Sequence, residues 1–168
     1  IIPTAINVNN TANYTFNGTG SIDGNAKFVK EGTGTVTMSG NNSYTGGNYL
    51  KGGVTKVSLL SNQYSATGNL GGITTVSTKF TMENGAVLQT TGNVEQGSPM
   101  KMIGEEGGVI NNASDFVMDA AFSGTKLTKK GAGWLKSGVT SSLATLVVSQ
   151  GVVDASNKLA SKIVAEGT

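Results

Sequence analysis

The run KEGTGTVTMSGNNSYTGG, from Lys30 to Gly47, constrains the fold of this chain more than any other feature. In its centre Val36 and Met38 alternate with threonines, and a period of two predicts a β-strand with one apolar face and one hydroxylated face. Flanking glycines and asparagines supply the positive φ angles of sharp bends. A weaker copy, KLTKKGAGWLKSG, begins at Lys126. An active site usually occurs once in a chain, so a repeated sequence motif indicates a repeated structural unit.

The two copies align over most of the chain. Four residues recur at a constant offset of 99: Lys27, Lys30, Gly32 and Gly34 match Lys126, Lys129, Gly131 and Gly133. Flanking matches drift in offset from 102, for Asn10 with Asn112, to 98 downstream, as expected when loops vary in length. We therefore predict a single domain, 1–168, with a first repeat unit of about 1–100 and a partial second unit of about 101–168.

Short β-prone runs occupy much of the remaining chain. They are Val54–Leu59, Thr75–Met82, Ala86–Gln89, Phe116–Met118, Leu127–Leu135, Leu143–Ser149 and Val152–Ala155. A sandwich of hairpins and a solenoid of parallel coils both fit such runs, and the internal repeat favours the solenoid. We predict an all-β, right-handed parallel β-helix of about eight coils, on the order of 40 Å long. The one helical candidate is Ala155–Ala165, which would partly cap the end.

Composition excludes several classes of function. The chain has no Cys and no His, which excludes thiolate chemistry, Cys/His zinc sites and a Ser/His/Asp arrangement. All twelve basic residues are Lys and the net charge is +2, so nucleic acid is not an expected partner. No cluster of acidic residues with a basic catalyst is visible. We therefore predict no enzymatic activity, no metal and no cofactor.

Charge is distributed unevenly along the chain. Residues 61–120 carry 2 Lys and 6 acids, whereas residues 121–168 carry 6 Lys and 2 acids. A solenoid would separate these charges along its axis. Such charge is usually solvated surface, although it would also help to orient neighbouring segments.

Residues 27–54, KFVKEGTGTVTMSGNNSYTGGNYLKGGV, resemble the autotransporter-associated β-strand repeat, also called the passenger-associated transport repeat. The usual form of that repeat runs L-x-K-x-G-x-G-x-L-x-L-x-G-x-N-x-Y-T-G-G-T. The segments FTMENGAVLQ and GEEGGVINNASDFVMDAAFSGTKLTKKGAGWLKSG also resemble the family, so the likeness covers nearly the whole chain. The second copy departs from the pattern, because SGVTSSLATLVV stands in place of N-x-Y-T-G-G and Trp134 stands where the first copy has Thr35.

The resemblance implies a right-handed parallel β-helix in the secreted passenger of a large bacterial surface protein. On that basis we expect a non-enzymatic structural or adhesive segment, exported to the cell surface and excised from a longer precursor. The implied partners are flanking coils of the longer chain, a surface glycan, or a protein of a host or neighbouring cell, and exposed ends predict end-to-end self-association. The alternative is a carbohydrate-binding or spacer module of a polysaccharide-degrading enzyme.

Three aromatic residues are candidates for stacking on sugar rings. Trp134 is predicted to face outward, because alternation along its strand directs Leu135 inward and Lys136 outward. Tyr44 and Tyr64 are the other two candidates. For Tyr44 the position in the repeat favours a loop aromatic that packs over a coil edge, and for Trp134 a covering loop is the competing interpretation.

Overall fold

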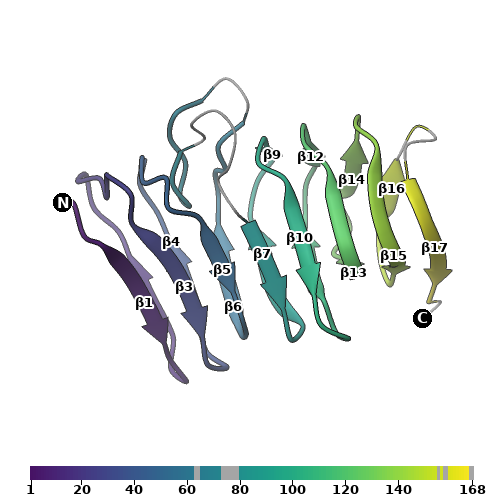
Figure 1. The fold of residues 1–168 in the computed structure, drawn as a ribbon, viewed down its shortest axis with the longest axis horizontal. Helices are drawn as coiled ribbons and strands as arrows, with labels where there is room; N and C mark the ends of the chain where they lie inside the picture. Colours follow the sequence, from purple (N-terminus) through teal and green to yellow (C-terminus); the bar gives the residue numbers. More distant parts are fainter. Residues whose placement is uncertain (63–64, 73–79, 155, 157–158, 167–168) are drawn as a thin grey trace.

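Parallel strands wind into a β-solenoid along the described chain (Figure 1). The computed structural model describes residues 1–62, 65–72, 80–154, 156 and 159–166. Within these residues every pairing between named strands is parallel, and no helix is present. The predicted fold class, an all-β parallel β-helix, is confirmed.

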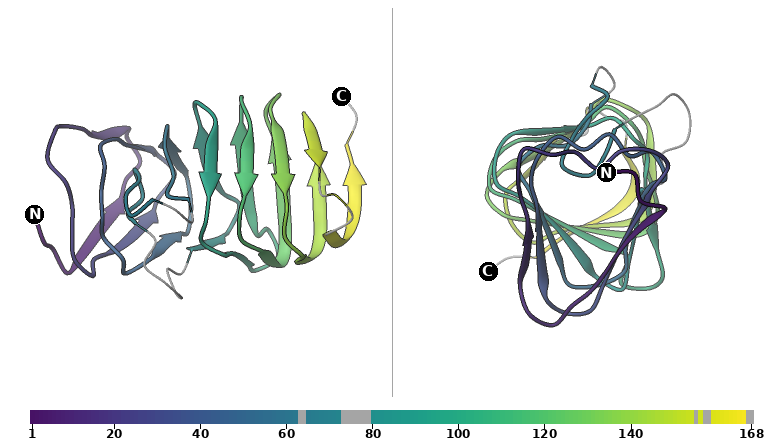
Figure 2. Two further views of the ribbon diagram at one scale, coloured as in Figure 1. Left: turned by 90° about the horizontal axis from the view of Figure 1, so that it is seen from above. Right: turned by 90° about the vertical axis from the view of Figure 1, so that its left-hand side faces the viewer.

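The strands line three walls, which the end-on view of Figure 2 shows as sides of a closed outline. The first wall contains β1 (Ala5–Asn9), β3 (Lys27–Glu31), β5 (Asn48–Leu50), β7 (Phe80–Glu83), β10 (Met100–Ile103), β13 (Phe122–Lys130), β15 (Ser141–Val148) and β17 (Leu159–Ala165). The second contains β2 (Tyr14–Phe16), β4 (Thr35–Met38), β6 (Val54–Val57), β8 (Ala86–Thr90) and β11 (Gly108–Asn112), followed by the later parts of β13, β15 and β17. The third contains β9 (Val94–Gln96), β12 (Phe116–Met118), β14 (Trp134–Ser137) and β16 (Val152–Asp154).

Turn length is regular with one exception. Most turns take 18 to 22 residues, from Ser141 to Leu159 at the short end and from Ala5 to Lys27 at the long end. The turn from Asn48 to its partner Phe80 takes 32 residues, and the extra length lies between β6 and β7. The eight described strands of the first wall enclose seven turns, one fewer than expected.

The core is built from inward residues that stack in register. On the first wall Phe28, Asn48, Phe80, Met100 and Phe122 follow one another from turn to turn, and all five are buried. Apolar contact along such a stack removes side chains from water at about 25 cal/mol per Å² of buried area. The one amide in the row, Asn48, donates from Nδ2 to the Leu70 carbonyl at 3.0 Å, so its polar group is satisfied.

Two sequence-based predictions of elements need correction, and part of a third lies outside the described residues. Leu127–Leu135 is not one strand, because Gly131 takes a φ of 78° and ends β13 before β14 begins at Trp134. Ala155–Ala165 is not a helix, because its described part forms β17 and pairs in parallel with β15. Leu159, Ile163 and Val164 are compatible with a strand as well as with a helix. Pairing with β15 in the preceding turn selects the strand. The first part of Thr75–Met82 lies outside the described residues, and β7 begins at Phe80.

Lys30 is fully buried where the first wall turns into the second. Its Nζ donates to the backbone carbonyls of Glu31, Gly32 and Gly52 at 2.7, 3.1 and 3.3 Å. These acceptors belong to two successive turns, so the ammonium ties the corners of adjacent turns together. Gly53 follows with a φ of 61°, and a Cβ there would lie 2.5 Å from the backbone carbonyl oxygens of Gly32 and Gly34, so the corner favours glycine.

Lys129 makes the same corner later in the chain and is also fully buried. Its Nζ donates to the carbonyls of Lys130, Gly131 and Gln150 at 2.7, 2.6 and 3.2 Å. A Cβ at Gly151 would lie 2.7 Å from Nζ. An ammonium has three donors, so three carbonyls satisfy it completely. We call each arrangement a lysine corner.

A buried asparagine supports each lysine corner from the preceding turn. Asn10 donates from Nδ2 to the carbonyls of Ala12 and Thr35, the latter at 3.1 Å. Asn112 donates in the same way to the carbonyl of Trp134 at 2.9 Å. The match of these asparagines in sequence therefore reflects a shared structural role.

The two lysine corners lie on different edges of the solenoid. Lys30 is in register with Leu50 on the first wall, and the chain then enters the second wall. Lys129 is in register with Ile110 on the second wall, and the chain then enters the third wall at β14. The sequence repeat therefore corresponds to one corner structure formed twice. It joins the first wall to the second in the first copy and the second wall to the third in the second copy.

Stability should depend on pH through Lys129. Burial lowers the pKa of this ammonium to about 8, from 10.5. Between those values the unfolded chain holds a proton that the folded chain has released, so the free energy of unfolding should rise with pH in that window. Urea denaturation at about pH 7.5 and about pH 9.5 should show a rise that is larger, by on the order of 1 to 2 kcal/mol, in the parent chain than in Lys129→Met.

The comparison of these two chains isolates the one group. Burial also lowers the pKa of Lys30, which makes stability rise with pH, and raises the pKa of Tyr44, which makes stability fall with pH above about pH 10. Both contributions are common to the two chains and cancel. An equal rise in both chains would contradict the assignment.

The facing of β4 predicts opposite outcomes for neighbouring substitutions. Val36 is fully buried, whereas Thr35 is only partly buried on the outer face, as the alternation predicts. Val36→Asp should unfold the chain, because an unpaired buried carboxylate costs several kcal/mol. Thr35→Asp should change the free energy of unfolding by less than about 0.5 kcal/mol. Thermal denaturation followed by circular dichroism measures both, and equal effects would refute the facing.

Candidate functional site

The outer face of the third wall carries aromatic, acidic and amide side chains. Alternation directs Phe116 and Leu135, which are in register on β12 and β14, into the core. The residues just before them, Asp115 and Trp134, therefore stand side by side on the outside, about 4.8 Å apart between strands. The next outward residue on β14 is Lys136, which is partly buried.

Trp134 is held in place by its neighbours but remains open to solvent. Its side chain is 44% exposed. The Lys136 Nζ lies 5.5 Å from the centroid of the indole ring, within the range of a cation–π contact, and 2.6 Å from Oδ2 of Asp115. The lysine thus links the acid to the ring and restricts the motion of both. The structure places Trp134 facing outward beside Lys136, as alternation predicts.

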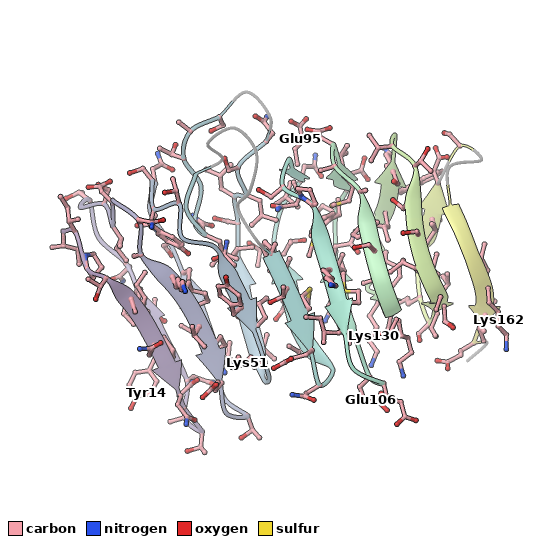
Figure 3. All side chains as sticks on the ribbon, viewed as in Figure 1. Tyr14, Lys51, Glu95, Glu106, Lys130 and Lys162 are labelled. Atoms are coloured by element: carbon pink, nitrogen blue, oxygen red, sulfur yellow. The ribbon has the colours of Figure 1, made fainter. Side chains whose placement is uncertain are left out.

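A cleft of about 350 Å³ lies beside Asp115 on the same face. Its lining includes Leu59, Asn62, Asn93, Glu95, Asp115 and Val117. Asn62 donates from Nδ2 to Oε2 of Glu95 at 2.6 Å, and the backbone N–H of Asp115 donates to Oδ1 of Asn93 at 3.1 Å. Figure 3 shows Glu95 at the upper edge of the solenoid, beside the loop that follows β6. Hydrogen bonds therefore preset the positions of the polar side chains that line the cleft.

Buried amides anchor the long turn that supplies one side of the cleft. Oδ1 of Asn69 accepts from the backbone N–H groups of Ser58 and Leu59, both at 2.8 Å. Nδ2 of Asn69 donates to the Gly40 carbonyl of the preceding turn at 2.8 Å. These hydrogen bonds fix Leu59 to the solenoid, so the side of the cleft that Leu59 lines is held in place by the fold.

The other two aromatic candidates do not join this face. Tyr44 is fully buried, and its hydroxyl donates to Oδ1 of Asn48 at 2.9 Å. Neither face of its ring is open to a ligand in this structure, and it packs inside the coil edge. Tyr64 lies outside the described residues.

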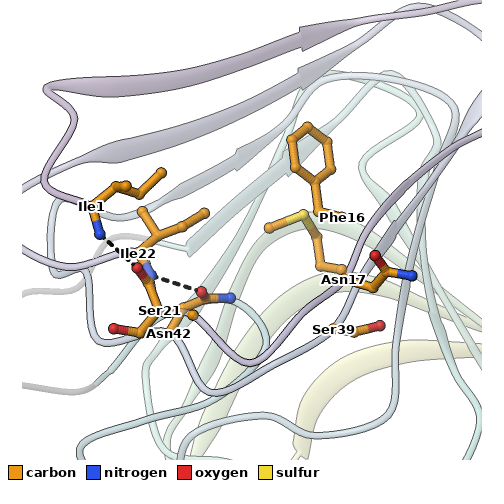
Figure 4. Close-up of a pocket in the computed structure, with 9 residues that line it drawn as sticks. Ile1, Phe16, Asn17, Ser21, Ile22, Ser39 and Asn42 are labelled. Carbon is orange, nitrogen blue, oxygen red and sulfur yellow. Dashed lines mark hydrogen bonds between the residues drawn. The ribbon is translucent and has the colours of Figure 1, made fainter.

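A second, mostly apolar pocket of about 330 Å³ opens at the N-terminal end of the solenoid (Figure 4). Its lining includes Ile1, Phe16, Ile22 and Met38. The amino group of Ile1 donates to the Ser21 carbonyl at 2.9 Å. This pocket is the end of the hydrophobic core of the first two turns, so its chemistry favours apolar contact over catalysis.

The electrostatics of the walls follow the uneven charge of the sequence. Glu106 and Lys126, one turn apart, form an ion pair of 2.9 Å where the acidic part of the chain meets the basic part. Among the described residues, no three acidic side chains come close enough to hold a metal ion. None of the described segments is a helix that could span a bilayer.

Sequence reasoning found Trp134 but missed the side chains that surround it. Asn93, just before β9, and Glu95, on β9, are two residues apart. Asp115 lies one strand spacing from Asn93, in the next turn. The alternation in VEQ and DFVM marks their facing, but only the register brings them to one place. Asn62 comes from the long turn, and no local sequence pattern links it to the third wall.

The chain is similar in sequence to a bacterial surface protein. The chain is 30% identical over 129 residues, which is 76% of its length, to the adhesin BmaC autotransporter of Brucella suis biovar 1. The match covers 4% of the length of that adhesin. No protein-family model and no solved structure matches the chain. Together with the solenoid, this weak similarity fits a segment of an autotransporter passenger.

Proposed function

We propose that this chain is a structural segment of the passenger of a bacterial surface adhesin, where its solenoid forms a stiff rod and offers its walls for contact. The observation that carries the proposal is the first wall, in which eight described strands stack in register from β1 to β17. The similarity to an adhesin autotransporter supports the setting at the cell surface.

A rod of this kind gains length by adding turns. Each turn contacts only its neighbours, so stability is close to a sum of turn and interface contributions. The variation between 18 and 32 residues per turn shows that loops change while the wall stays continuous. Such tolerance suits a spacer between a cell and its target. We propose that flanking coils continue the rod in the longer protein.

The ends of the isolated chain should be sticky. Among the described strands, β1 pairs only with β3 and β17 only with β15, so each leaves one edge unpaired. Tyr14 and Phe16 of the first turn are 58% and 40% exposed. Sedimentation velocity at several concentrations should therefore show self-association, and the addition of flanking coils should raise the melting temperature.

Charged substitutions would locate the contact. Phe16→Lys should weaken the association, because it places a charge on the end surface. Ile103→Lys should leave the association unchanged, because Ile103 is similarly exposed, at 37%, but lies on β10 in the middle of the first wall, between β7 and β13. A chain that stays monomeric at all concentrations would contradict this prediction.

Surface labelling tests the proposed setting directly. Antibodies raised against the purified chain should label intact cells of the organism that makes the protein, with no increase after permeabilisation. Labelling that requires permeabilisation would overturn the proposed surface role. The second candidate function, a carbohydrate-binding module within a polysaccharide-degrading enzyme, is favoured only by Trp134 and the adjoining cleft.

A further inference from the structure

We infer that the outer face of the third wall binds an uncharged oligosaccharide, with one sugar ring on the indole of Trp134 and the next ring in the cleft beside Asp115. This deepens the surface role proposed above and rests on it only for the setting in which a glycan is met. The binding site itself rests on four residues that lie in one row across the wall: Asn93, Asp115, Trp134 and Val152.

The row combines an apolar platform with polar groups. Trp134 is in register with Val152 on β16, and these two side chains are 44% and 39% exposed. Leu59, which is 42% exposed, stands at the far side of the cleft. Pyranose rings have apolar faces and hydroxylated edges, so a flat aromatic ring beside hydrogen-bonding groups matches both parts of the ligand.

The spacing of the row suits more than one sugar ring. Asn93, Asp115 and Trp134 lie on three neighbouring strands, so the first and last are about 10 Å apart along the solenoid axis. The cleft of about 350 Å³ begins where the platform ends, and its volume lies within the range of small-molecule sites. A ligand that lies parallel to the axis would therefore contact both.

The polar side chains are already oriented. Lys136 holds Oδ2 of Asp115 at 2.6 Å, and Asn62 holds Oε2 of Glu95 at 2.6 Å. Among the described residues, Oδ1 of Asp115 and Nδ2 of Asn93 engage no protein partner, so one acceptor and one donor remain for sugar hydroxyls. Preset side chains lose little conformational entropy on binding, which favours affinity.

Charge selects among saccharides. Along its four described strands the face carries the carboxylates of Glu95, Asp115 and Asp154 against one cation, Lys136. An anionic polysaccharide would meet like charge, which disfavours association. An uncharged oligosaccharide meets no such repulsion.

The fluorescence of Trp134 provides a direct test, because this is the single tryptophan of the chain. The purified chain would be titrated with soluble tetrasaccharides of the cello-, malto-, xylo- and galacto-series and with tetragalacturonate. We expect a saturable change in emission with at least one neutral series, and binding of tetragalacturonate at least about tenfold weaker. No saturable change with any neutral series, or tighter binding of the anion, would overturn the inference.

Substitutions then locate the ligand by isothermal titration calorimetry. Trp134→Ala should lower the affinity at least about tenfold, whereas Trp134→Phe, which keeps an aromatic face, should stay within about threefold. Asn93→Ala should lower the affinity about fivefold. Tyr14→Ala removes a comparably exposed aromatic ring from the N-terminal turn, on β2, and should leave the sugar affinity unchanged. Equal binding by Trp134→Ala and the parent chain would refute the site.

Two controls keep the outcomes separate. Circular dichroism and the melting temperature of each variant show whether the solenoid is intact, and a half-exposed ring on an outer wall can be removed without opening the core. Surface labelling does not depend on sugar binding, so a failed titration would refute the glycan site and leave the proposed surface role standing.

Discussion

Each turn of this solenoid hydrogen-bonds through its strands to the turns before and after it, at a spacing of about 4.8 Å. A residue that faces inward therefore lies against an inward residue of the next turn, and its facing cannot change without breaking the ladder. Lys30 and Lys129 show the strength of this constraint, because both face the interior and are fully buried. Three backbone carbonyls around each ammonium offset the cost of burying its charge.

The two lysine corners lead into different walls. In the first copy the chain passes from the corner at Lys30 into β4, on the second wall. In the second copy it passes from the corner at Lys129 into β14, on the third wall. Between β4 and β5 an irregular segment that includes Tyr44 stands where no strand of the third wall is formed. The ordered outer face that carries Trp134 begins only at β9, after the long turn.

Structural and adhesive roles are compatible in such a molecule, since they use different parts of it. The buried stacks and corners give stiffness, and outward positions are free to vary as long as the alternation is kept. The row of Asn93, Asp115, Trp134 and Val152 occupies outward positions alone. A binding surface can therefore be added to one wall at little cost to the rod, and the cleft follows from a longer loop in one turn.

The sequence by itself determined the parallel β-helix, the inward facing of Val36 and the outward facing of Trp134, because local alternation and the repeated glycine phrase report strand faces and corners. It did not determine that Ala155–Ala165 ends in a strand, since only the edge of β15 selects β17 over a helix. The sequence aligned Lys30 with Lys129 but did not show that the two residues lie on different walls. The wall that a residue joins depends on the summed lengths of the turns between the two copies. Only the register of separate turns brought Asn93, Asp115 and Trp134 together, since these side chains are neighbours in space through turns of about twenty residues.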